Sequence, residues 1–121
     1  MIKCIGLIKR RPGLTHAQFA DYYENHHAPL ARPYLAAARR YARRYLETGK
    51  LDHQGDAALP GAEEYDCLTE LWFDDRPTME ATLAHLATPE VAAVIVPDEE
   101  RFIDRTALRF FIIENESING E

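Results

Sequence analysis

The sequence has little cysteine, no long hydrophobic run and no excess of positive charge. Its two cysteines, Cys4 and Cys67, are far apart and form no Cys-x-x-Cys motif, so we expect buried free thiols and no disulfide framework. No apolar run approaches the roughly 18 residues of a membrane span, and the N-terminal segment lacks the length and cleavage site of a secretory signal. These absences predict a cytoplasmic protein that has no membrane partner.

The charge balance argues against a nucleic-acid-binding protein. The 121 residues include 14 basic and 20 acidic side chains, a net charge of −6, whereas nucleic-acid binders usually carry a basic excess. One local exception is the segment RRYARRY at residues 39–45, because basic and aromatic side chains together can bind single strands. We interpret it as a strand whose arginines point to solvent or pair with the abundant carboxylates, and we expect no nucleic-acid partner.

Hydrophobic periodicity and turn residues divide the chain into strands and helices. Residues 38–47 have the propensity for a helix, but the alternation of Tyr41, Arg43 and Tyr45 with their neighbours suits a strand at least as well. The polar segment 48–64 is long for a loop in a compact domain, which is typical of mobile or functional loops. The sequence predicts strands over 2–9, 38–47, 65–75 and 107–115, and helices over 16–27, 76–87 and 89–96.

The helix boundaries are indicated by capping residues and prolines. Thr15 followed by Gln18 forms a capping-box pattern at the start of the first helix. Pro29 biases the residue before it away from helical geometry, so this helix is expected to end near His27. Pro97 is expected to end the last helix in the same way.

This order of elements predicts an α+β fold, a ferredoxin-like plait in which helices cover one face of a four-stranded antiparallel sheet. We expect residues 1–115 to form the domain and 116–121 a polar tail. Helices cover only one face, so the face that carries Leu68, Glu70 and Trp72 is expected to pack against a second copy in a homodimer. Glu70 then needs a partner, and we expect an arginine from residues 39–44.

The opposite face of the same strand is expected to meet the helices and line a cavity. Alternation places Thr69 and Leu71 on that face, and a mostly apolar cavity there suits an aromatic or terpenoid-sized ligand. Gly6 would leave room for it in the first strand. The expected cavity residues from the two strands are Cys4, Gly6, Ile8, Cys67, Thr69 and Leu71.

His26 and His27 are the most chemically distinctive residues of the chain. An imidazole exchanges protons near neutral pH, and Tyr23, one helical turn earlier, could donate a hydrogen bond to a developing enolate. The structural alternative is that a histidine here only interacts with the last carbonyls and the dipole of its helix. Adjacent histidines point about 100° apart on a helix and rarely share one ion, so no metal site is expected.

Three segments of the sequence resemble the EthD family of the dimeric α+β-barrel superfamily. They are KRRPGLTHAQFADYYENHHAPLA at 9–31, YDCLTELWFDD at 65–75 and ERFIDRTALRFFIIEN at 100–115, and the resemblance spans about residues 1–115. The segment VAAVIVPDEE at 91–100 and the loop at 48–64 depart from the family pattern. The resemblance implies a homodimer whose sheets form a barrel, one cavity in each subunit, and a functional histidine at His27.

The resemblance also implies small-molecule chemistry without a metal or organic cofactor. Similar proteins are described as dehydratases or decarboxylases, and related barrels include cyclases, lactone isomerases and quinone-forming monooxygenases. We therefore expect a cofactor-free enzyme of lyase or isomerase type for a small hydrophobic carbonyl or phenolic compound, with His27 and Tyr23 catalytic and Phe19 and His26 near the substrate. A carrier protein for a partner oxygenase and a cofactor-free monooxygenase are the alternatives. The sequence leaves the substrate and the reaction type open.

Overall fold

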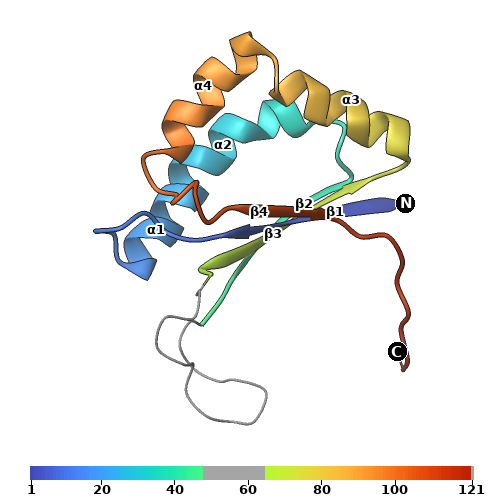
Figure 1. The fold of residues 1–121 in the computed structure, drawn as a ribbon, viewed down its shortest axis with the longest axis horizontal. Helices are drawn as coiled ribbons and strands as arrows, with labels where there is room; N and C mark the ends of the chain where they lie inside the picture. The colour runs from blue at the N-terminus through green and yellow to red at the C-terminus, as the bar shows by residue number, and fades with distance from the viewer. Residues whose placement is uncertain (48–64, 121) are drawn as a thin grey trace.

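The computed structural model describes residues 1–47 and 65–120, which form a single antiparallel sheet covered on one face by helices (Figure 1). The order of strands in the sheet is β2-β3-β1-β4, and every neighbouring pair is antiparallel. The predicted ferredoxin-like α+β fold is confirmed, and the predicted loop at 48–64 lies outside the described residues. The strands are β1 (Ile2–Ile8), β2 (Arg40–Tyr45), β3 (Cys67–Phe73) and β4 (Arg109–Ile112).

Four helical segments follow one another without a break after β1. Thr15 accepts the backbone N–H of Gln18, whose side chain accepts the backbone N–H of Thr15, so the predicted capping box is confirmed. The predicted end near His27 is wrong, because the backbone stays helical as far as Leu35. The segments are α1 (His16–Tyr22), the π-helical η1 (Tyr23–His27), α2 (Ala28–Ala31) and the 3₁₀-helical η2 (Arg32–Leu35).

The π-helical turn accounts for the continuation of the helix through Pro29. In a regular α-helix a proline ring clashes with the carbonyl four residues earlier. The wider turn of η1, in which the backbone N–H of Ala28 donates to the carbonyl of Tyr23, changes that spacing immediately before Pro29. Single π turns of this kind are frequent at functional sites, and this one carries both histidines.

Two further helices follow β3: α3 (Arg76–Leu86) and α4 (Pro89–Glu99). Asp75 caps α3 by accepting the backbone N–H of Thr78. The predicted end of α4 at Pro97 is wrong, since Pro97 lies inside its last turn. Proline has no N–H, so the carbonyl of Ala93, four residues before Pro97, lacks its helical hydrogen bond. Ala93 is exposed, so water can donate to that carbonyl.

None of the described helices is by itself long and apolar enough to cross a membrane. The helices α3 and α4 reach the required length and composition only as a pair, and the chain bends by 77° between them.

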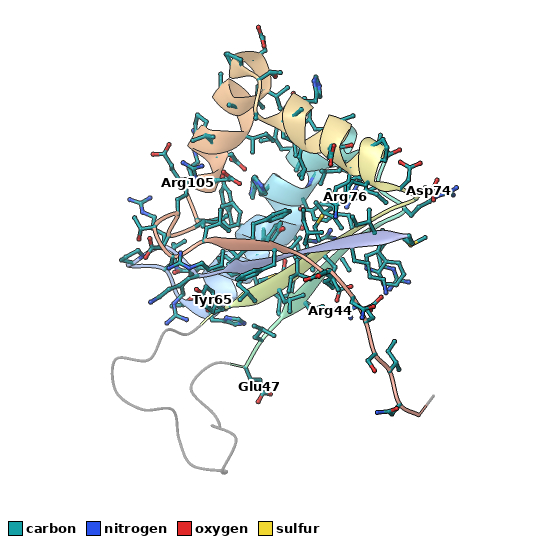
Figure 2. The ribbon with its side chains drawn as sticks, turned by 45° about the vertical axis from the view of Figure 1, so that its right-hand side comes forward. Arg44, Glu47, Tyr65, Asp74, Arg76 and Arg105 are labelled. Carbon is teal, nitrogen blue, oxygen red and sulfur yellow. The ribbon has the colours of Figure 1, made fainter. Side chains whose placement is uncertain are left out.

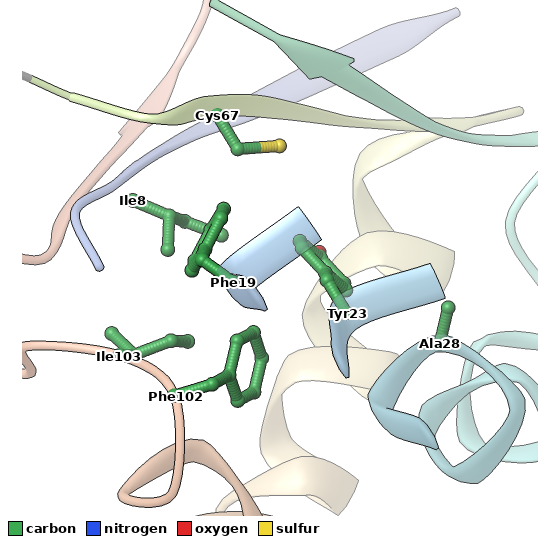
Figure 3. Close-up of a cluster of buried hydrophobic side chains, with 7 residues drawn as sticks. All are labelled: Ile8, Phe19, Tyr23, Ala28, Cys67, Phe102 and Ile103. Carbon is green, nitrogen blue, oxygen red and sulfur yellow. The ribbon is translucent and has the colours of Figure 1, made fainter. Parts of the chain in front are cut away.

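The hydrophobic core lies between the sheet and the helices and has two parts. In one part, Phe19 and Tyr23 lie between the strands and Phe102, with Ile8 and Cys67 on the strand side (Figure 3). The ring centroids of Phe19 and Phe102 are 5.5 Å apart. Complete burial of such a side chain contributes about 1.5–3 kcal/mol to stability. The second part contains Cys4, Ala31, Leu35, Leu71, Phe73 and Met79.

The other face of the sheet has charged side chains around Trp72. The indole N–H of Trp72 donates to Glu70, and the ammonium of Lys3 and the guanidinium of Arg40 lie 4.2 Å and 4.4 Å from the indole centroid. Arg44, on the side of the sheet away from the helices, donates to Glu70 at 2.9 Å (Figure 2). The expectation that an arginine of residues 39–44 pairs with Glu70 is therefore confirmed within one chain.

Two other arginines of the basic segment also have carboxylate partners, and the fourth, Arg40, lies over the indole of Trp72. Arg39 donates to Asp74, and Arg43 forms an ion pair with Glu24. The interpretation of residues 39–45 as a strand whose arginines pair with carboxylates is confirmed for Arg39, Arg43 and Arg44.

Candidate active site

A cavity of about 150 Å³ lies between the helices and the covered face of the sheet. Gly6 and Thr69, which pair directly across β1 and β3, contribute to its floor, and His27 and Tyr23 line it from η1. The lining is mainly apolar. A cavity of this volume accommodates about one benzene-sized ring.

Tyr23 is held at the cavity by a chain of hydroxyl groups. The hydroxyl of Tyr41 donates to that of Tyr23 at 3.0 Å, and the hydroxyls of Tyr23 and Thr69 are 2.8 Å apart. Burial raises the pKa of Tyr23 well above its ordinary value, which keeps the phenol protonated. Tyr23 is therefore able to donate a hydrogen bond to Thr69 or to a bound oxygen.

His27 is buried, with 6 % of its surface exposed, and its ring is held by Asp98 of α4. Nδ1 of His27 lies 2.8 Å from a carboxylate oxygen of Asp98, and the other oxygen of Asp98 accepts the hydroxyl of Tyr22 at 2.6 Å. A carboxylate accepts hydrogen bonds, so Nδ1 carries the proton and Nε2 holds the lone pair of the neutral ring. This arrangement is able to orient a histidine as a proton acceptor.

The carboxyl groups of Asp98 and Glu99 differ in their environments although the residues are adjacent. Burial opposes the ionisation of Asp98, but the hydrogen bonds from Tyr22 and His27 outweigh it and lower its pKa. Burial raises the pKa of Glu99, although His27 and Arg105 act in the opposite direction. Glu99 lines the cavity and forms an ion pair with Arg105, with 3.3 Å between Nε and Oε1.

Four residues expected at the site lie away from the cavity lining. His26 is exposed and stacks on Tyr22, with 4.8 Å between ring centroids, because it points to a different side of η1 from His27. Phe19 and Cys67 are completely buried in the core. The thiol of Cys4 contacts the sulfur of Met79 at 3.2 Å. The cysteines are free thiols, as the sequence predicted.

The structure places the other six expected residues at the cavity: Gly6, Ile8, Tyr23, His27, Thr69 and Leu71. Sequence reasoning did not identify Tyr41, Asp98 and Glu99. The alternation in β2 placed Tyr41 on the same face as Arg43, but no pattern indicated which side of the sheet that face meets. Asp98 and Glu99 follow Pro97 in the segment 91–100, which departs from the family pattern. That departure was the only feature of the sequence that drew attention to these two carboxylates.

A second hollow lies at the start of α1 and is polar. It has a volume of about 400 Å³ and is lined by residues 9–14 and Asp66. Both carboxylate oxygens of Asp66 are engaged, by the backbone and side chain of Arg10 and by His16. Within the described ranges, no three His, Cys, Asp or Glu side chains come together as ligands for one metal ion.

The fold and the cavity define a ferredoxin-like α+β protein with one small apolar site between its sheet and helices. The family model of the EthD domain matches residues 11–106, which is most of the chain. The chain therefore belongs to the EthD family. A search of curated proteins found no match.

Three of the solved structures of similar fold come from bacteria. An ethyl tert-butyl ether D family protein from Bacillus halodurans is 21% identical with a TM-score of 0.62, and the alignment covers 96% of this chain and 100% of that one. A dimeric protein of unknown function with a ferredoxin-like fold from Bacteroides fragilis is 13% identical, with a TM-score of 0.56 and coverage of 94% and 95%. A candidate antibiotic biosynthesis monooxygenase from Deinococcus radiodurans is 20% identical, with a TM-score of 0.53 and coverage of 100% and 99%. These similarities show the fold.

Proposed function

We propose that this protein is an acid–base enzyme for a small hydrophobic carbonyl or phenolic compound, in which His27 accepts a proton from the substrate. The observation that carries the proposal is the pair of His27 and Asp98 beside an apolar cavity of about 150 Å³. A histidine held by a carboxylate is a suitable base near neutral pH, and removal of a proton next to a carbonyl needs no nucleophile. The chemistry requires neither a metal nor an organic cofactor.

Tyr23 supplies the second group that such a reaction needs. Loss of a proton next to a carbonyl leaves negative charge on the carbonyl oxygen, and a donor fixed before the reaction stabilises that charge. The hydroxyl of Tyr23 is buried and protonated, and Tyr41 already donates to it. Because Tyr41 supplies the proton of that bond, the single hydroxyl proton of Tyr23 is available to a ligand oxygen once its contact with Thr69 is broken.

We also propose that the enzyme is a homodimer. The uncovered sheet face presents Leu68 and Trp72 beside Glu70, and Phe111 on the edge strand β4 is 49 % exposed. Apolar groups in this position favour association with a second copy. The similar Bacteroides fragilis protein is described as dimeric. Light scattering of the wild type and of Leu68→Lys tests the proposal: a wild-type monomer would contradict it.

Hydrogen–deuterium exchange of cyclohexanone in deuterium oxide, followed by mass spectrometry, tests the base. The wild type should accelerate exchange next to the carbonyl, and His27→Gln should lower this activity roughly 10²- to 10⁴-fold, the usual contribution of a general base. His26→Gln is the matched control because His26 is the adjacent exposed histidine. Equal exchange by wild type and His27→Gln, or no exchange by either, would overturn the proposal.

The similarity to a candidate monooxygenase favours one second function, the oxidation of a phenol by oxygen in the same cavity. Oxygen consumption with a single-ring hydroquinone distinguishes it from proton transfer. Binding of cyclohexanone without exchange or oxidation would indicate a carrier protein instead.

A further inference from the structure

Glu99 is a carboxyl group at the cavity that the proposed proton abstraction does not use. It lies in the last turn of α4, directly after the residue that holds His27, and it lines the same cavity from that helix. Its side chain is 20% exposed, although glutamate is among the residues least often buried. A carboxyl group placed among apolar side chains beside a histidine base is a candidate for proton transfer.

The groups around Glu99 act on its ionisation in opposite directions. His27 of η1 and Arg105, which follows α4, favour the carboxylate, whereas the neighbouring Asp98 and burial favour the neutral acid. The net result is a raised pKa for Glu99, beside an Asp98 whose pKa is lowered. Two carboxyl groups whose environments separate them in this way are suited to different roles. Asp98 remains the acceptor that holds His27, and Glu99, which lines the cavity, binds a proton more readily than an ordinary glutamate does.

We propose that Glu99 is a catalytic residue of this site, the acid that donates a proton to a leaving hydroxyl group while His27 removes a proton. The inference rests on the proposed function of His27. It assigns a substrate class: single-ring carbonyl compounds with a hydroxyl group on the β-carbon. Hydroxide leaves poorly, and a carboxylic acid in hydrogen-bond reach converts it into water.

The step balances within the two side chains and the substrate. Nε2 of His27 takes the proton from the carbon next to the carbonyl, and the electron pair of that C–H bond forms a carbon–carbon double bond. The bond from the β-carbon to oxygen breaks, and its electron pair stays on the oxygen, which takes the proton of Glu99 and leaves as water. Glu99 is then a carboxylate beside Arg105, and proton exchange with solvent restores His27 and Glu99.

Arg105 is a positioning residue in this scheme. Its Nε contacts Oε1 of Glu99 at 3.3 Å, and its side chain is 43% exposed. A partner in contact with solvent stabilises the product carboxylate only moderately. Arg105 therefore orients the carboxyl group of Glu99 and still allows that group to be protonated.

Two probes separate the acid from the base. Cyclohexanone can only exchange its protons, whereas 3-hydroxycyclohexanone can also lose water to a conjugated cyclohexenone, which is followed by ultraviolet absorbance. Glu99→Gln keeps the shape of the side chain and removes its acid. This variant should lower elimination roughly 10²- to 10⁴-fold more than it lowers exchange of cyclohexanone. Glu100→Gln is the matched control, since Glu100 is the exposed neighbour on the same helix end.

Titration of the glutamate carboxyl carbons by carbon NMR reads the protonation of Glu99 without turnover, with the resonance assigned by its loss in Glu99→Gln. A titration midpoint of Glu99 above that of Glu100 supports the inference, and a midpoint equal to that of Glu100 overturns it. Elimination that is lowered in Glu99→Gln no more than exchange is, or that is absent from a wild type that exchanges cyclohexanone, also overturns it. Exchange that does not depend on His27 overturns the proposed function itself, which is a different result.

Discussion

Replacement of Asp98 by asparagine tests how the structure holds its base. The carboxylate accepts two hydrogen bonds, from Nδ1 of His27 at 2.8 Å and from the hydroxyl of Tyr22 at 2.6 Å. Asparagine has the same shape but only one acceptor oxygen. If that oxygen stays with Tyr22, the amide nitrogen faces His27, which must then accept at Nδ1 and carry its proton on Nε2. The lone pair needed at the cavity is lost.

The size of the effect follows from the two contacts. A hydrogen bond to a charged group contributes about 1.5–3 kcal/mol, and one between neutral groups about 0.5–1.5 kcal/mol. Asp98→Asn should therefore lower the free energy of unfolding by about 1–3 kcal/mol near neutral pH. Loss of the correct form of His27, at a similar cost of about 1.5–3 kcal/mol, should slow proton exchange roughly 10- to 150-fold.

The loss of stability should depend on pH in a defined direction. The hydrogen bonds from Tyr22 and His27 lower the pKa of Asp98 below its ordinary value of 3.8, against the effect of burial. Stability from such a group is complete above the ordinary value and declines as the pH falls through the folded-state pKa. Wild type and Asp98→Asn should therefore become equally stable in that acidic range.

Urea unfolding over a pH series measures the stability, and deuterium exchange into cyclohexanone measures the activity. Glu100→Gln, an exposed change at the same helix end, should leave both near wild type. A folded Asp98→Asn protein with wild-type exchange would refute the role given to Asp98. A stability difference that is the same at all pH values would refute the electrostatic argument.

Three other changes have definite expected results. Asp66→Asn should lower the free energy of unfolding, measured in urea, by about 2–4 kcal/mol, because Asp66 is almost fully buried and its charge is bound by Arg10 and His16. Those bonds outweigh the effect of burial and lower the pKa of Asp66, so the stability difference should vanish in acid. A stability difference that does not change with pH would contradict this. Tyr23→Phe should slow cyclohexanone exchange roughly 10²- to 10³-fold as a lost oxyanion donor, and wild-type exchange would remove Tyr23 from the site. Gly6→Ala should stay within about 1 kcal/mol of wild type in thermal unfolding, since its new methyl group would lie 3.6 Å from Phe110, an ordinary contact; a large loss would show that the strand requires glycine.

The sequence by itself determined which side chains share a face of the sheet and where the first helix begins. Side chains alternate in a strand with a period of two. Once this segment forms a strand, Thr69 and Leu71 must therefore lie on the other face of the sheet from Leu68. The capping box at Thr15 depends only on residues three apart. The family resemblance predicted a functional role for His27, and this role stays a prediction.

Only the tertiary structure decided what surrounds that histidine. Proline rules predicted a helix end where the chain forms a π turn, and this turn buries His27 while His26 stays exposed. Asp98 is 71 residues away in the sequence, so its contact with His27 depends on how α4 packs against η1. The volume of the cavity and the burial of Glu99 depend on the same packing, because no local pattern records how closely two helices approach a sheet.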